Sequence, residues 1–149
     1  MENKNTKTQL AIIGAGPGGY TAAFRAADLG IEVTLIDASS KLGGICLNEG
    51  CIPSKSLLHI SDIIEKSNKA KEAGINFNKP KINIDKIHDW KNKIIGNLNS
   101  GIKKLAEARK INVINGVAEF TSANQLKIED SQNKKIQLDF EYCIIATGS

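Results

Sequence analysis

The sequence GAGPGG at residues 14–19 lies between two segments of different character. It follows the apolar run QLAII at residues 9–13, which is typical of a buried parallel strand, and it precedes a helical pattern over residues 20–29. A second apolar run, IEVTLI at residues 31–36, ends at Asp37. The order of strand, glycine-rich turn, helix and strand predicts a βαβ unit with parallel strands.

The glycines of this turn have the G-x-G-x-x-G spacing, and a position between strand and helix is the context in which that spacing binds dinucleotides. The first glycine permits a tight turn, the second lets the backbone approach a pyrophosphate, and the third lets helix and strand pack closely. The phosphates are expected at the start of the helix. The predicted cofactor-binding residues of the turn are Gly14, Gly16, Pro17, Gly18 and Gly19.

Asp37 closes the second strand near the spacing at which an acidic residue binds a ribose 2′-hydroxyl. Its negative charge would repel a 2′-phosphate. The glycine turn and Asp37 together do not distinguish FAD from NAD, so this motif leaves both dinucleotides open.

The stretch GGICLNEGCIPSK at residues 43–55 contains two of the three cysteines. In a regular helix, Cys46 and Cys51 would lie ~7.5 Å apart along the axis, farther than the Cα separation of about 4.4–6.8 Å that a disulfide allows. The backbone between them is therefore predicted to loop, and Gly50 supplies the conformational freedom. Pro53 suits a first helical turn, which places Cys51 at or just before a helix N-terminus, where the dipole favours a thiolate. These features predict a redox pair.

Composition and charge exclude several classes of function. The 149 residues suffice for one domain, and 41% hydrophobic with 24% charged residues is ordinary for a globular protein. The net charge of +4 is scattered without a basic stripe, so no nucleic-acid partner is expected. Every apolar run is too short to span a bilayer, and no membrane association is expected. Residues 1–8 are polar and predict a disordered lead-in without a secretory signal, which indicates the cytoplasm.

The rest of the chain predicts an α/β fold: a Rossmann-like domain over residues 9–149, with a parallel sheet, flanking helices and a small antiparallel β-meander. Helical patterns cover two segments separated by a polar loop at 75–84, and strand patterns cover five. The helices are expected at 53–73 and 85–109, and the strands at 111–114, 117–120, 125–129, 135–139 and 142–146.

The four motifs together resemble the pyridine nucleotide–disulfide oxidoreductases. These motifs are GAGPGG, the acid at Asp37, GGICLNEGCIPSK and ATGS at 146–149. The wording CLNEGCIPSK, followed by SLLH at 56–59, is most similar to the members that oxidise dihydrolipoyl groups. The resemblance implies FAD as the bound cofactor and NAD⁺ as the final electron acceptor. Other flavin disulfide reductases (glutathione or mercuric reductase, soluble transhydrogenase) and a non-catalytic nucleotide-binding module are the alternatives.

The resemblance also implies unequal roles for the two cysteines. Cys46 would be the exposed interchange thiol that reacts with the substrate, and Cys51 would face the flavin. Lys55 would lie near the flavin N5 atom.

Further cofactor contacts follow from the same resemblance. Gly44 and Ile45 would approach the FAD phosphates, and Ala118 would meet the adenine through its backbone. Thr147 and Gly148 would come close to the cofactor from the end of the last strand.

The sequence departs from the family pattern at two of these positions. Asp37 stands where Glu is more frequent, and Ile45 stands where many members have Thr. The remaining cysteine, Cys143, lies in a buried-strand pattern and is interpreted as a small core residue. His59 and His88 have no metal-ligand spacing with each other or with the cysteines, so no metal site is predicted.

Enzymes of this family are several times longer, with NAD-binding and dimerisation domains after the FAD-binding part. By resemblance, the chain is expected to be an N-terminal fragment whose fold is incomplete. We expect such a fragment to self-associate and to have weak or absent turnover alone. The full enzyme is expected to be a homodimer that serves the dihydrolipoyl groups of 2-oxoacid dehydrogenase complexes.

Overall fold

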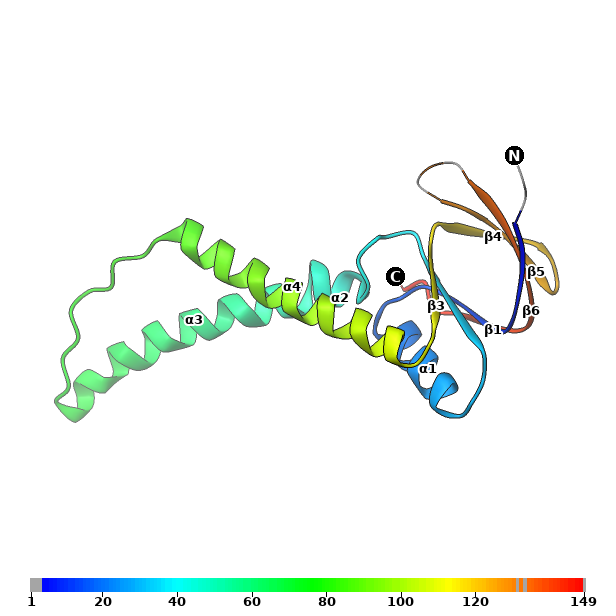
Figure 1. Ribbon diagram of the computed structural model, residues 1–149. Coiled ribbons are helices and arrows are strands. Elements are labelled where there is room, and N and C mark those ends of the chain that lie inside the picture. Colours follow the sequence, from blue (N-terminus) through cyan, green and yellow to red (C-terminus); the bar gives the residue numbers. More distant parts are fainter. Residues whose placement is uncertain (1–3, 131, 133, 149) are drawn as a thin grey trace.

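The structure is a computed structural model that describes residues 4–148 except 131 and 133 (Figure 1). Its six strands form one mixed sheet in the order β3-β2-β1-β6-β5-β4. Neighbours from β3 to β6 are parallel, whereas β6, β5 and β4 are antiparallel. The strands are β1 (Lys4–Ile13), β2 (Val33–Asp37), β3 (Asn112–Asn115), β4 (Val117–Ser122), β5 (Gln125–Glu129) and β6 (Lys135–Ile145). The predicted α/β class, with a parallel part and an antiparallel meander, is confirmed.

The prediction of a disordered lead-in is wrong for residues 4–8, which form the first half of β1. These residues pair with residues 136–140 of β6. Thr8 is buried, and its hydroxyl donates a hydrogen bond to the carbonyl of Glu32 at 3.0 Å. The polar composition concealed the strand because its pairing partner lies more than a hundred residues away in sequence. Residues 1–3 of the predicted lead-in lie outside the described residues.

The division of 135–146 into two strands is also wrong, since β6 is a single strand of 11 residues. Phe140 lies at the predicted break, yet it is only 5% exposed. Its backbone N–H donates to the carbonyl of Asn124 at 3.0 Å, which continues the pairing of β6. Strand β6 therefore joins the parallel half of the sheet to the antiparallel half, because it pairs with β1 along one edge and with β5 along the other.

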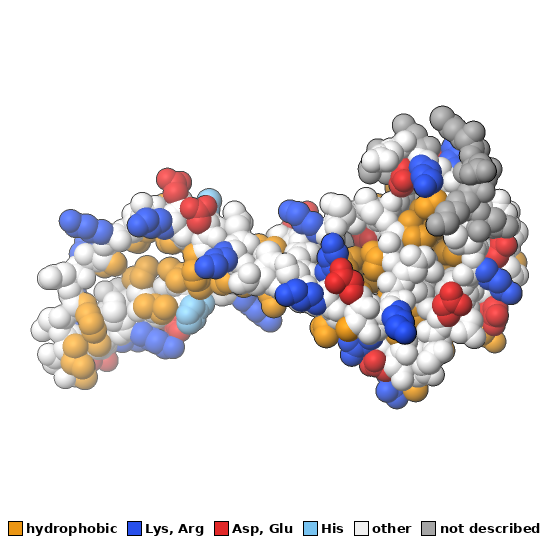
Figure 2. Space-filling model, in the orientation of Figure 1, with side chains coloured by type: hydrophobic (Ala, Val, Ile, Leu, Met, Phe, Trp, Pro, Cys, Tyr) orange, Lys and Arg blue, Asp and Glu red, His pale blue; other side chains and the backbone are white. Residues whose placement is uncertain are grey.

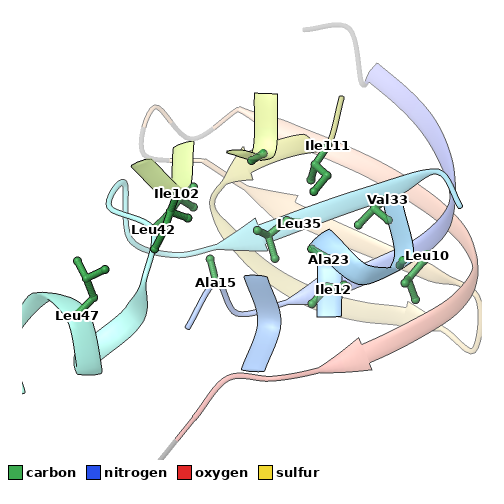
Figure 3. Close-up of a cluster of buried hydrophobic side chains, with 12 residues drawn as sticks. Leu10, Ile12, Ala15, Ala23, Val33, Leu35, Leu42, Leu47, Ile102 and Ile111 are labelled. Carbon is green, nitrogen blue, oxygen red and sulfur yellow. The ribbon is translucent and has the colours of Figure 1, made fainter. Parts of the chain in front are cut away.

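The helices are α1 (Pro17–Asp28), α2 (Gly44–Asn48), α3 (Cys51–Lys69), the 3₁₀ turn η1 (Ala70–Ala73) and α4 (Ile84–Ala108). Helices α1, α3 and α4 follow the predicted segments closely, whereas the short helix α2 was not predicted. The main core lies between the sheet, α1 and the C-terminal part of α4 (Figure 3). Ala23 of α1, Leu35 of β2 and Ala106 of α4 are almost completely buried in it.

Helices α3 and α4 form an arm that projects from the sheet (Figure 1). Three apolar side chains of α3 are largely uncovered: Leu57, Leu58 and Ile63 are 43%, 66% and 50% exposed. Figure 2 shows hydrophobic side chains at the surface of this arm. Trp90 of α4 stacks on His59 of α3, with ring centroids 6.4 Å apart. Within the described part of the chain, no helix combines the length and apolar character needed to cross a membrane.

Candidate dinucleotide and redox site

The glycine turn joins β1 to α1 through backbone that leaves no room for two side chains. Gly14 has a φ of +102°, and a Cβ there would lie 2.6 Å from the carbonyl carbon of Ala146. A Cβ on Gly19 would lie 2.8 Å from the carbonyl carbon of Gly14 and would overlap its oxygen. By contrast, a Cβ on Gly18 would meet nothing within 4 Å. Gly14 and Gly19 thus serve the packing of turn, helix and last strand, as the fingerprint requires.

A cavity of about 750 Å³ opens at the carboxyl ends of the parallel strands, beside this turn. Ligands of open α/β sheets bind at this edge. Eleven of the fourteen predicted site residues line the cavity. They are Gly14, Gly16, Pro17, Gly18, Asp37, Gly44, Ile45, Cys46, Cys51, Thr147 and Gly148.

Three predicted residues do not line the cavity. Gly19 is buried beneath the turn. Lys55 is exposed on α3, one turn after Cys51, and its charge acts on Cys46. Ala118 lies in β4 and packs against a second core cluster, so its contact with adenine stays a prediction.

The carboxylate of Asp37 is held at the end of β2 by two backbone donors. One oxygen accepts from the N–H of Ala15, and the other accepts from the N–H of Ser39 at 2.7 Å. A carboxylate has about four acceptor positions, so each oxygen keeps capacity for a further donor such as a ribose hydroxyl. Asn115, at the end of β3, donates to the carbonyls of Asp37 and Ala38 at 3.0 and 3.1 Å. Asn115 therefore fixes the backbone that carries the acid.

Sequence reasoning missed six residues of the cavity wall. They are Ser39, Lys41, Asn48, Glu49, Gly50 and Ala146. Five of them lie in the segments that connect Asp37 to Gly44 and Cys46 to Cys51, and Ala146 directly precedes Thr147. Proximity along the chain to a predicted residue was the available signal.

The cysteine pair lies where the backbone breaks between two helices. Cys46 is in α2, and Cys51 begins α3, which confirms the predicted position of Cys51 at a helix N-terminus. At the break, the N–H groups of Glu49 and Gly50 both donate to the carbonyl of Ile45, each at 2.8 Å. This turn brings the two side chains together, within hydrogen-bond reach of each other.

The pKa of Cys46 is raised above its ordinary value, first by the hydrogen bond with the Cys51 side chain. Burial and the negative charge of a Cys51 thiolate raise the pKa of Cys46 further, whereas the backbone of Cys51 and the charge of Lys55 lower it. Cys51 is exposed and Cys46 is half-buried, which is the reverse of the exposure expected for an interchange thiol at Cys46. The assignment of separate roles to the two sulfurs stays a prediction.

The third cysteine is placed differently. Cys143 is half-buried in β6 and packs against the second core cluster, in agreement with its interpretation as a small core residue. Burial raises the pKa of the Cys143 thiol. Across the described residues, no group of three or more His, Cys, Asp or Glu side chains gathers as a metal site would require.

These features define a class of protein: a dinucleotide-binding α/β fold with a thiol pair in the wall of its cavity. The family model described as "Pyridine nucleotide-disulphide oxidoreductase" matches residues 8–149, and the chain belongs to this family. It is 45% identical to a dihydrolipoyl dehydrogenase of Vibrio cholerae over 147 residues, which are 99% of this chain and 31% of that protein. A dihydrolipoyl dehydrogenase of Buchnera aphidicola subsp. Schizaphis graminum is 46% identical over 147 residues, with the same shares of the two chains covered.

The resemblance extends to an archaeal protein. Dihydrolipoyl dehydrogenase 3 of Haloarcula marismortui is 44% identical over 146 residues, which are 97% of this chain and 30% of that protein. The chain thus spans about 31% of the length of the bacterial relatives above.

Proposed function

We propose that the chain is the flavin-binding, disulfide-carrying part of a dihydrolipoamide dehydrogenase. Electrons would pass from dihydrolipoyl groups through Cys46 and Cys51 to FAD, and then to NAD⁺. One observation carries the proposal: both cysteines line the same cavity as the glycine turn. A thiol pair in that position lies beside whatever dinucleotide the turn binds.

The residues of the cavity fit FAD. Gly16 and Gly44 place bare backbone side by side, since a Cβ on Gly44 would lie 2.7 Å from the Cα of Gly16. Bare backbone at a helix start is suited to a pyrophosphate. Asp37 adds acceptor capacity for a ribose hydroxyl, and Lys41 adds a positive charge to the same wall. When bound, FAD supplies the acceptor that takes two electrons from a dithiol and gives them to NAD⁺.

The chemistry of this chain itself is a thiol–disulfide exchange. One thiolate of the dihydrolipoyl group attacks the sulfur of Cys46, and the Cys46–Cys51 bond breaks with Cys51 leaving as a thiolate. The second thiol of the dihydrolipoyl group then attacks the dihydrolipoyl sulfur that is bonded to Cys46, and this attack releases Cys46. The substrate leaves as the cyclic disulfide, oxidised by two electrons, and the two cysteines are reduced by the same two. Lys55 provides a nearby positive charge that stabilises the thiolate form of Cys46.

Two partners belong to the same proposal. The dihydrolipoyl groups are those of 2-oxoacid dehydrogenase complexes, and the enzyme acts as a homodimer. The names of the relatives support the substrate class.

The test is dihydrolipoamide-dependent reduction of NAD⁺ by the protein that carries residues 1–149. Cys46→Ser and Cys51→Ser should each reduce this activity to background, because neither variant can form the disulfide. Cys143→Ala is the matched control and should keep most of the activity, because Cys143 lies in β6 outside the cavity wall. Full activity in either serine variant would refute the electron path. Reduction of glutathione disulfide in place of dihydrolipoamide oxidation would refute the substrate class.

A further inference from the structure

One side chain, that of Asn48, links the two ends of the segment that carries Cys46. Helix α2 has five residues, and no side chain caps its N-terminus. A helix this short is not stable by its backbone bonds alone. The amide group of Asn48 donates to the carbonyl of Leu42 at 3.1 Å and to the carbonyl of Gly44 at 2.9 Å. Asn48 therefore ties the last residue of α2 to its start and to the residues before it.

The remaining hydrogen-bonding atom of Asn48 is used by a distant helix. Its Oδ1 atom accepts a hydrogen bond at 2.8 Å from the amide group of Asn99, which lies 51 residues further along the chain in α4. The second N–H of Asn99 donates to the carbonyl of Ile95 at 3.3 Å, so its amide is held to its own helix. Both amide N–H groups of Asn48 and its oxygen then have partners, which fixes the orientation of the side chain.

Asn99 is a poor choice for the helix alone. Asparagine is among the less favourable residues in a helix interior, and position 99 lies well inside the 25 residues of α4. The side chain is half-buried against α2 rather than free in solvent. The hydrogen bond with Asn48 explains why asparagine stands at position 99, although its helix propensity is low.

The same helix also meets this segment through apolar side chains. Leu42, Leu47 and Ile102 belong to one buried cluster (Figure 3). These apolar contacts bury side chains but impose no fixed orientation, whereas the hydrogen bond between Asn99 and Asn48 requires a particular geometry. Packing thus holds α2 near α4, and the hydrogen bond sets its orientation.

We propose that Asn99 is a positioning residue for the cysteine pair. It orients Asn48, and through Asn48 the start of α2, so that Cys46 is held against Cys51. The inference rests on the proposed function in one respect, since it assumes that the two cysteines form a disulfide.

The effect should be measurable as the equilibrium between the dithiol and the disulfide. In a buffer of reduced and oxidised dithiothreitol, the protein disulfide is reduced as dithiothreitol is oxidised, and both exchanges involve two electrons. A looser α2 lowers the effective concentration of one thiol at the other, which makes the disulfide easier to reduce. Loss of one neutral hydrogen bond predicts a change of about threefold to tenfold in this equilibrium constant. That change corresponds to a potential about 14–30 mV less negative.

The experiment compares Asn99→Ala and Asn99→Asp with Asn97→Ala in the protein that carries residues 1–149. The redox state is measured by trapping free thiols with an alkylating agent and determining the masses of the products by mass spectrometry. Asn97 is the same residue type two positions away, but it is exposed and makes no side-chain hydrogen bond among those of the described residues. Asn99→Asp keeps the shape of the side chain and removes the donor, so both Asn99 variants should shift the potential and Asn97→Ala should not.

Two results would overturn the inference, and they differ from failure of the proposed function. If the Asn99 variants keep the potential of the unchanged protein, Asn99 does not position the pair. If Asn97→Ala shifts it equally, the effect belongs to α4 in general. If the unchanged protein forms no Cys46–Cys51 disulfide at any buffer ratio, the proposed electron path fails instead. Urea unfolding of each variant separates a local shift from loss of the fold.

Discussion

Two neighbouring glycines of the turn should respond in opposite ways to the same substitution. Gly18 and Gly19 are both in the first turn of α1, but only Gly19 is one of the three glycines of the G-x-G-x-x-G fingerprint. A Cβ on Gly19 would lie 2.8 Å from the carbonyl carbon of Gly14, against at least 3.4 Å in ordinary contact, and the obstacle is backbone. Gly14 cannot move aside, because its own position is limited by the backbone of Ala146.

The magnitudes follow from these contacts. Overpacking costs typically 1–3 kcal/mol, and a clash with immovable backbone puts Gly19→Ala at about 3 kcal/mol of lost stability. Gly18→Ala enters open space, so the gain from a less flexible unfolded chain should leave it unchanged or more stable by up to ~1 kcal/mol. In a domain of this size, 1 kcal/mol shifts the Tm by roughly 2–4 °C, so the two variants should differ by about 6–16 °C.

The assay is urea unfolding followed by far-ultraviolet circular dichroism, with flavin removed so that stability is measured without a ligand. Equal midpoints for the two variants, or a less stable Gly18→Ala, would refute the argument that Gly19 is required for packing. The slope m is the dependence of the free energy of unfolding on urea concentration. A change in m for one variant would mean that the unfolded or folded state has changed, and the two variants are then compared by their Tm values from thermal unfolding.

Two further predictions concern the thiol pair and the attachment of α4. In the reduced protein, alkylation of Cys46 should follow its thiolate and reach its midpoint above the pH of an ordinary thiol, because the hydrogen bond with Cys51 raises its pKa. Cys51→Ala should move that midpoint to lower pH and Lys55→Met to higher pH, as read by site-resolved mass spectrometry; the opposite signs would contradict the assigned causes. Arg109 forms an ion pair with Asp28 of α1 at 2.9 Å, so Arg109→Leu should destabilise the fold by ~1 kcal/mol in urea unfolding. A double-mutant cycle with Asp28→Asn should show coupling that weakens at high salt, and purely additive losses would count against the pair.

Much of the site was predictable from the sequence because its constraints are local. The turn at residues 14–19 and the break between Cys46 and Cys51 are set by residue types a few positions apart. Short spacing also placed Asp37 at the end of its strand. For these parts, the local amino-acid sequence is enough to predict the backbone geometry of the site.

The missed features depend on partners far away in sequence. Residues 4–8 are polar, and only their pairing with β6 makes them a strand. Asn99 gives no signal by itself, since its role is visible only when α4 lies beside Asn48. Apolar residues such as Leu57 and Ile63 recur at helical spacing in α3, but periodicity does not say whether a partner covers the face that they form.

The glycine fingerprint combines two separate requirements, and the structure divides it between them. Gly14 and Gly19 are needed by the fold, because a side chain at either position would collide with backbone. Gly16, the middle glycine of the fingerprint, is not, since a Cβ there would meet nothing closer than 3.9 Å. Gly16 lines the cavity, so its missing side chain leaves space for a ligand rather than for the protein. A chain selected for packing alone has no reason to keep glycine at position 16, and this is why the full motif indicates a bound dinucleotide, while Gly14 and Gly19 alone would indicate only a tight turn.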